Sequence, residues 1–244
     1  MKLELNRREF KNDFKIAMNV TDKVGRPNLE YCVISGKKSV GGLILLQATD
    51  GHRLIEIEEP NISCDEDFEI KIHRSDFKMV HEFLKLSTPK ITITTDINTL
   101  SPSFDGKIEI LRSVDHKEAI ILMTERRSSF IVFPDTEKLK NEWIYNQSVE
   151  MDAKIFSIIC GNKTDVGIQF NFPKGNVHLT DHKNKIHSEV SQDLKSDDNF
   201  YIHINPQLVK SVFDKGEVLI SYSGDTHPVR FIQRSKKLYV MQRR

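Results

Sequence analysis

The sequence contains one succession of secondary-structure elements twice, and this repeat limits the possible folds more than any other feature. Near the N-terminus, the predicted strand 3–5 leads to Asn6, a predicted helix N-cap, and to a helix with Phe10, Phe14, Ala17 and Met18 on one face. The same succession returns at 149–152, where Asp152 is the predicted cap of a helix containing Ile155, Phe156, Ile158 and Ile159.

The second half of the repeated unit is a strand followed by another helix. The strand 68–72 precedes a helix capped by Ser75 or Asp76, with Phe77, Val80 and Leu84 on its apolar face. The strand 200–204 precedes Asn205-Pro206, which opens a helix with Val209 and Val212 inside, and Gly216 is predicted to end it. Further strands are predicted at 43–46, 54–58, 89–94, 107–111, 119–123, 130–133, 217–220, 230–232 and 238–241.

The repeat predicts both the fold class and the domains. Two copies of a unit with two helices and mainly antiparallel strands make an α+β chain. We expect one domain at 1–140 and a second at 141–244, and we interpret the polar stretch 136–147 as the connection between them.

Composition excludes several classes of protein. The chain has 244 residues with 36 Lys and Arg against 35 Asp and Glu, so its net charge of +1 does not by itself indicate a nucleic-acid partner. The three cysteines, Cys32, Cys64 and Cys160, lie far apart, which is typical of a reducing compartment and of neither a disulfide scaffold nor a zinc module. No signal peptide or membrane-spanning stretch is predicted, so we expect a cytoplasmic location.

Both predicted helices of the first copy carry a basic stripe opposite the apolar one. Arg8, Lys11 and Lys15 share a face of the first helix, and Arg74, Lys78, His81 and Lys85 share a face of the second. The loop between the helices adds Lys23 and Arg26. Two interpretations stay open: solvated helix faces, or a surface presented to a phosphate backbone.

The heptapeptide Ala48-Thr49-Asp50-Gly51-His52-Arg53-Leu54 lies between two predicted strands. Asp-Gly in this position predicts a hairpin, because both residues tolerate the positive φ of a tight turn, and a simple turn is one complete interpretation. The seven residues also resemble, letter for letter, the signature of the bacterial DNA polymerase III beta subunit, the sliding clamp.

The resemblance extends over nearly the whole chain. Residues 26–33, Phe133-Pro134-Asp135 and the tail 239–244 are similar to segments of the middle and last domains of that family, with its first domain absent. It implies two tandem clamp domains, each with two helices on an antiparallel sheet, that assemble into a ring around DNA. It also implies a peptide-binding groove with one wall from each domain, formed by Leu29, Thr49, Gly51, His52, Arg53, Leu54, Pro134, Lys138, Leu139, Val240, Met241, Gln242 and Arg243.

The helices of the family face the DNA, so the resemblance also assigns the cations. The residues expected to face DNA are Arg8, Lys11, Lys15, Lys23, Arg26, Arg74, Lys78, Lys85, Lys154 and Lys210. The tail departs from the family, because its usual proline is Gln242, its next methionine is Arg243 and its last apolar residue is missing. A familiar arginine of the connection falls near Lys138. These departures concern which peptide the groove prefers.

Other motifs do not indicate an enzyme, a metal or a cofactor. Asn162-Lys163-Thr164-Asp165 matches a guanine-recognition pattern, but the sequence has no phosphate-binding loop to accompany it. The histidines have no metal-ligand spacing, and the acids 65–67 are typical of a solvated loop. We expect no catalytic residues and no cofactor.

Two functions of different classes follow. The first is a DNA processivity factor that encircles duplex DNA and binds a polymerase and a clamp loader through short peptides. The alternative is a non-ring protein that sequesters or modulates clamp-binding partners. Counting units favours a head-to-tail homotrimer for a ring, because the relatives close rings of six units. Oligomeric state therefore separates the two.

Overall fold

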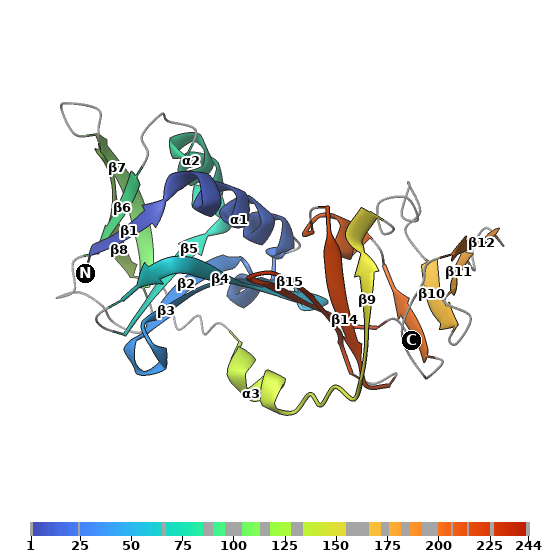
Figure 1. Cartoon of the computed structure of the whole chain (residues 1–244). Coiled ribbons are helices and arrows are strands. Elements are labelled where there is room, and N and C mark those ends of the chain that lie inside the picture. The colour runs from blue at the N-terminus through green and yellow to red at the C-terminus, as the bar shows by residue number, and fades with distance from the viewer. Residues whose placement is uncertain are drawn as a thin grey trace. The chain divides into compact units, whose positions relative to one another are not determined.

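The chain divides into two compact units, Met1–Gly51 with Ile55–Pro134 and His52–Leu54 with Asp135–Arg244 (Figure 1). The predicted domain limits, 1–140 and 141–244, stay a prediction. The computed structural model describes residues 2–23, 25–64, 67–84, 90–95, 104–112, 118–127, 134–154, 166–171, 176–181, 186–191, 200–205, 207–213, 215–224 and 227–242.

One sheet of the first unit joins the start of the chain to its later strands. Its order is β1 (Lys2–Asn6), β6 (Lys90–Thr95), β8 (Glu118–Arg127) and β7 (Phe104–Arg112). Strand β1 pairs antiparallel with β6, and β7 pairs antiparallel with β8. The pair of β6 and β8 is parallel, so β7 lies at the edge although it precedes β8 in the chain.

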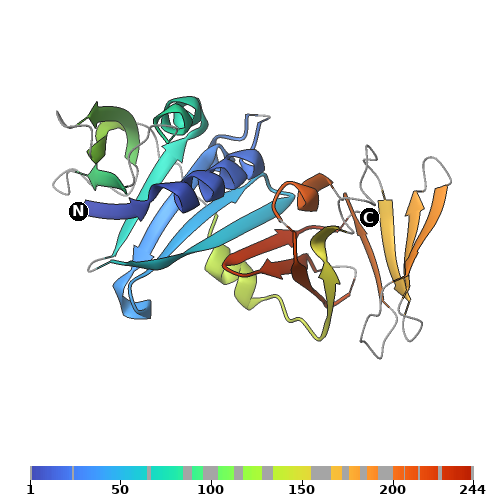
Figure 2. The same cartoon turned by 45° about the horizontal axis from the view of Figure 1, so that its top comes forward.

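The other strands of the first unit lie side by side in the order β5 (Phe68–His73), β2 (Tyr31–Lys37), β3 (Leu43–Thr49) and β4 (Arg53–Ser63). Helices α1 (Arg7–Val20) and α2 (Phe77–Phe83) lie over one face of these strands (Figure 1 and the turned view of Figure 2). Short 3-10 turns are η1 (Pro27–Leu29), η2 (Lys38–Val40) and η3 (Arg74–Asp76).

The apolar stripe of α1 builds the core of the first unit. Phe10, Phe14 and Ala17 are fully buried, whereas Met18 is half-buried. The Phe14 ring stacks on Phe10 at 5.7 Å and meets the Phe77 ring edge-on at 5.6 Å, which joins the two helices. Strand β5 contributes Phe68, Ile70 and Ile72, because alternate residues of a strand point to the same face. The predicted inner faces of both helices are confirmed.

The second unit repeats this strand order. Strands β13 (Phe200–Ile204), β10 (Val166–Asn171), β11 (Asn176–Asp181) and β12 (Ile186–Ser191) follow one another as β5, β2, β3 and β4 do, and their pairs are antiparallel. Its remaining strands are β9 (Gln147–Asp152), β14 (Glu217–Tyr222), β15 (Val229–Gln233) and β16 (Lys236–Val240), in the order β16-β15-β14-β9. The α+β class and the duplication are therefore confirmed.

The helices of the second unit differ in detail from the predictions. The predicted cap of its first helix is confirmed, because Asp152 Oδ1 accepts a hydrogen bond from the Lys154 amide at 2.9 Å. The rest of that helix lies outside the described residues. Helix α5 (Gln207–Lys210) ends well before Gly216, which has a φ of 120° in the turn before β14. The connection 136–147 contains an unpredicted helix, α3 (Thr136–Asn141).

Candidate functional site

The heptapeptide forms the predicted hairpin between β3 and β4. Gly51 has a φ of 79°, and its amide donates a hydrogen bond to Thr49 Oγ1 at 3.1 Å. A Cβ atom on Gly51 would lie 2.6 Å from Arg26 Nη1 and 3.3 Å from Leu29 Cδ1. Glycine is thus required here for both its backbone conformation and its size.

Arg26 braces this turn from the loop after α1. Its guanidinium donates from Nε and Nη2 to the Asp22 carboxylate at 3.0 and 3.2 Å, and Nη2 also donates to the Asp50 carbonyl. The Arg26 amide donates to Asp22 Oδ2 at 3.1 Å. This hydrogen bonding with Asp22 raises the pKa of Arg26. From the sequence, Arg26 is expected to face DNA. The brace has no sequence signal, because an acid four residues before an arginine indicates a pair only on a helix, and α1 ends at Val20.

Residues His52–Leu54, around the start of β4, belong to the second unit and form hydrogen bonds with it. The Met241 amide donates to the His52 carbonyl at 2.8 Å. Arg53 Nη1 donates to the Leu208 carbonyl at 3.1 Å and to Ser211 Oγ at 3.3 Å. Arg53 is therefore positioned by the segment around α5.

The apolar residues expected in the groove differ in exposure. Leu29, Leu54 and Val240 are buried, at 7%, 6% and 0% exposed. Met241 is 44% exposed, and His52 is also exposed. Thus Met241 and His52 present side-chain surface to solvent, whereas the other three support the fold around them.

The tail is held by the residue that departs from the family. Gln242 Nε2 donates to the carbonyl of Gly224 at 2.7 Å and to that of His227 at 3.0 Å, both in the loop before β15. A proline has no side-chain donor for these bonds. Gln242 therefore anchors the tail to its own unit by hydrogen bonds, and Arg243 lies outside the described residues.

The segment 134–145 places the remaining expected groove residues. Pro134 is half-buried, and the backbone of Lys138 and Leu139 lies in α3, while their side chains are outside the described part. After α3, the Trp143 ring packs against Tyr239 at 5.4 Å, and the Arg230 guanidinium lies 4.2 Å above the Tyr145 ring. Burial raises the pKa of Tyr145 to about 12, although Arg230 acts in the opposite direction. From Asp135 onward this segment belongs by its contacts to the second unit, whereas Pro134 is the last residue of the first.

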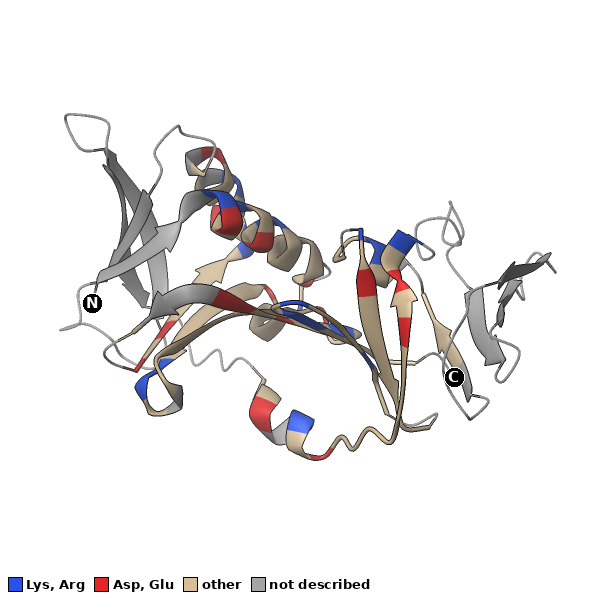
Figure 3. Ribbon diagram, in the orientation of Figure 1, with Lys and Arg blue, Asp and Glu red and all other residues tan. Residues whose placement is uncertain are grey.

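Most of the described cations that are expected to face DNA are exposed. Figure 3 shows where Lys and Arg fall along the described part of the chain. Arg8 and Lys15 are exposed on α1, with Lys11 half-buried between them, and Lys78 is exposed on α2. Arg74 is half-buried in η3, and Lys23 is exposed in the loop after α1. In the second unit Lys154 and Lys210 are exposed, while Lys85 of the first unit lies outside the described residues.

The described residues contain neither a membrane-spanning helix nor a metal-binding cluster. No described helix is both long enough and apolar enough to cross a membrane. Among the residues placed in the ranges given above, no group of three His, Cys, Asp or Glu side chains is arranged to hold a metal ion.

Comparison with known proteins gives matches at the level of structure. No protein-family model matches the sequence, and no curated protein sequence matches it. The DNA polymerase III beta subunits of Pseudomonas aeruginosa and Thermotoga maritima both match with a TM-score of 0.76, at 14% and 17% identity. The beta clamp of Helicobacter pylori, solved with a DNA ligase peptide bound, matches with a TM-score of 0.75 at 14% identity.

The matches cover all of this chain but only part of each relative. They span 100% of the 244 residues, and 66%, 65% and 65% of the Pseudomonas, Thermotoga and Helicobacter chains respectively. These matches confirm the sliding-clamp fold that the resemblance of the heptapeptide implies. The chain has the fold of the bacterial DNA polymerase III beta subunits, the sliding clamps, over about two thirds of their length.

Proposed function

We propose that this chain is a sliding-clamp subunit that encircles duplex DNA without reading its sequence and tethers a DNA polymerase and other partners. The duplicated clamp fold carries the proposal, because a clamp works by its ring topology and the whole chain has this fold. The role requires no catalysed reaction, only a closed ring, a weakly basic lining and a binding site for peptides. A clamp loader is the partner that such a ring needs for opening.

The proposed ring is a head-to-tail homotrimer. Each chain supplies two units, so three chains supply the six that the resemblance implies. Helices about 10–12 Å in diameter line the proposed hole, and four units from a dimer would leave too narrow a bore for a duplex. Repeated head-to-tail contact closes into a ring, and the unpaired edges of terminal sheets are suited to such contact.

Oligomeric state and topological binding test the proposal together. In sedimentation and native mass spectrometry over a concentration series, the expected species is a trimer in exchange with monomer. On linear duplex with biotin at both ends, streptavidin added after the protein is expected to trap it against a high-salt wash. Streptavidin added before the protein is expected to prevent the trapping, because a ring threads over free ends.

The outcomes separate the ring from the alternative function. A chain that stays monomeric at high concentration and is never trapped would favour a non-ring protein that sequesters clamp-binding partners. A closed dimer would contradict the unit count. Salt-resistant trapping that does not depend on the order of addition would exclude encirclement as its cause.

The peptide-binding groove belongs to the same proposal. We place the ligand's apolar anchor against Met241 and its polar register contacts at His52 and Arg53. Support comes from the exposure of Met241 and His52 and from the hydrogen bond between their backbones. An extended peptide binds where apolar side chains accept its anchors and a few polar groups fix its register.

Replacing Met241 with aspartate is expected to weaken binding of a polymerase-tail peptide by at least about tenfold, since truncating an anchor contact costs on the order of 2 kcal/mol. Met241 is 44% exposed, so the change leaves the core intact. Leu43→Asp is the matched control, because Leu43 is 36% exposed and lies outside the proposed groove. Fluorescence anisotropy with a labelled peptide that binds the wild-type chain measures the effect. Equal affinities for the two variants would remove Met241 from the groove.

A further inference from the structure

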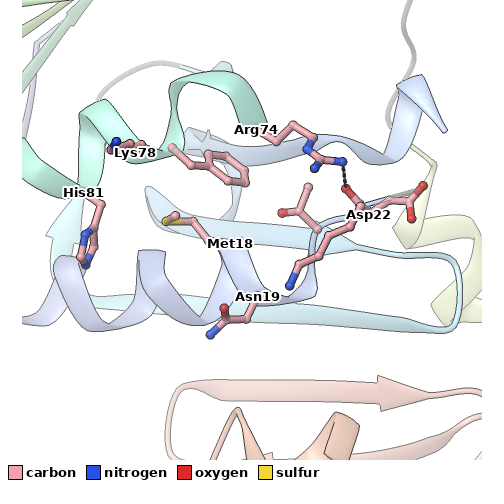
Figure 4. A pocket seen from close by; sticks show the side chains of 9 residues that line it. Met18, Asn19, Asp22, Arg74, Lys78 and His81 are labelled. Atoms are coloured by element: carbon pink, nitrogen blue, oxygen red, sulfur yellow. Dashed lines mark hydrogen bonds between the residues drawn. The ribbon is translucent and has the colours of Figure 1, made fainter. Parts of the chain in front are cut away.

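A cavity of about 420 Å³ opens in the first unit between the end of α1, the loop that follows it, and η3 with α2 (Figure 4). None of the residues that line it belongs to the expected peptide-binding groove. Residues that line it include the apolar Met18 and Phe77, the acid Asp22, and the cations Lys23, Arg74 and Lys78.

The cavity has an apolar part that is held rigidly. Phe77 is only 6% exposed, and its ring is fixed edge-on against Phe14 at 5.6 Å. Met18 is half-buried and its side chain lies between the two helices (Figure 4). Thr21 Oγ1 donates to the Ala17 carbonyl at 3.0 Å, which closes the end of α1 beneath the loop. Met18, backed by the buried Phe77 ring, therefore offers a preformed apolar surface rather than one that must be ordered by its ligand.

The polar part of the cavity is cationic because Asp22, the single acid in its lining, is already hydrogen-bonded to Arg26. The Asp22 side chain is 2% exposed, and its carboxylate accepts hydrogen bonds from the Arg26 amide and guanidinium. Arg74 Nη1 donates to the Asp22 main-chain carbonyl at 3.1 Å, which directs the arginine along the rim (Figure 4). Arg74 Nη1 lies 3.9 Å from Glu30 Oε1, whereas Lys23 and Lys78 are exposed at the opening. An anion thus meets cations from the loop, from η3 and from α2.

We infer that this cavity binds a nucleoside phosphate, with the phosphate at Lys23, Lys78 and Arg74 and the base against Met18. A phosphate alone would leave most of the volume and the apolar surface unused, whereas cavities of roughly 300–1,000 Å³ with a few polar groups hold ligands of nucleotide size. Bases also gain from stacking on apolar and aromatic surfaces beside a basic groove.

The inference goes beyond encirclement of duplex DNA. A base inside a duplex is stacked and paired, so it cannot enter a cavity between two helices without being extruded. The ligand is therefore an unpaired nucleotide, either within a single strand or free in solution. Both sources share the same chemistry, and the probes below distinguish them.

Binding of fluorescein-labelled oligo(dT) to the full chain tests the site. Lys23→Ala with Lys78→Ala is expected to weaken binding by about tenfold and to lower the salt slope by about 1.4, or 0.7 for each phosphate contact in a single strand. Lys37→Ala with Lys38→Ala is the matched control, since both lysines are exposed in the same unit and neither lines the cavity. Equal weakening by the two pairs would overturn the site, because it would show only diffuse charge attraction.

The base contact needs its own test. Met18→Ala is expected to weaken binding of oligo(dT) several-fold and to leave binding of an abasic strand of the same length unchanged. Equal losses on both strands would overturn the base contact. Unfolding curves by circular dichroism show whether each variant keeps its fold, and the abasic strand gives the same check through binding.

Competition identifies the ligand. Displacement of oligo(dT) by dTMP supports a free nucleotide, and displacement only by unlabelled single strands supports an unpaired nucleotide of a strand. Equal displacement by inorganic phosphate or by an acidic peptide would overturn the assignment to nucleotides. The trapping assay of the wild-type chain on linear duplex is run in parallel. A failure there contradicts the ring and leaves the cavity result standing, and the reverse holds as well.

Discussion

Replacing Lys11, Lys15 and Lys210 with glutamate is expected to reduce threading onto linear duplex at low salt by at least about tenfold. The three lysines come from α1 and α5, and none of them lines the cavity between α1 and α2. A clamp lining attracts phosphates without base contacts, so reversing its charge weakens attraction to every sequence alike. The affinity for unlinked duplex is expected to fall as well, and its salt slope to decrease by about three.

A control with the same change in charge separates local from overall electrostatics. Lys37, Lys38 and Lys215 are exposed, are distributed two to one between the units as the first set is, and have no part in the proposed lining. Their replacement with glutamate changes the net charge equally. The trapping assay and duplex anisotropy compare the two variants. If both lose threading to the same extent, the lining assignment is wrong and only the overall charge matters.

The sequence predicted elements whose signal is local and periodic. Phe10, Phe14 and Ala17 recur at helical spacing after a capping residue, and α1 begins at Arg7 and buries all three. The turn at Asp50 and Gly51 was predictable because Asp-Gly is typical of hairpin turns, although only Gly51 adopts a positive φ. The repeat was predictable too, because strand and helix patterns kept their order in both halves of the chain.

Contacts between residues distant in sequence were not predictable in the same way. The bond from Arg26 to the Asp50 carbonyl joins residues 24 positions apart, and nothing in either segment specifies its partner. The alternating pattern of a strand does not specify which other strand it pairs with. The parallel pairing of β6 with β8 was therefore not predictable from the sequence. The sequence shows that Gln242 departs from the clamp pattern, but it does not show that the side chain donates to two carbonyl groups in another loop.

Helix α3 was missed for a different reason. It is six residues long, so it has no apolar period to detect. The sequence Asp135-Thr136-Glu137 after Pro134 is a helix-start signal, and Lys140 pairs with Glu137 at 2.9 Å one turn later. Short helices of this kind are specified by what they pack against more than by propensity. The expected groove residues Lys138 and Leu139 therefore lie in a helix rather than in an extended connection.

Replacing Phe14 with alanine is expected to destabilise the first unit by about 3–5 kcal/mol, the usual cost of removing a buried phenylalanine from a core. Phe14 is fully buried and contacts Phe10 and Phe77, so the variant leaves a cavity where α1 meets α2. Both the proposed basic lining and the proposed nucleotide site depend on these two helices keeping their positions. Denaturant unfolding followed by circular dichroism measures the loss.

The lone tryptophan of the chain gives this experiment a second readout. Trp143 packs on Tyr239 in the second unit, so its fluorescence reports the unfolding of that unit alone. If the two units are separate folding domains, Phe14→Ala shifts the circular-dichroism transition and leaves the midpoint of the Trp143 transition in place. Phe231→Ala is the matched variant, because Phe231 is fully buried in the second unit near Phe213, and it is expected to shift the Trp143 transition instead. Equal shifts of the Trp143 midpoint by both variants would show one cooperative unit and contradict the predicted division into two domains.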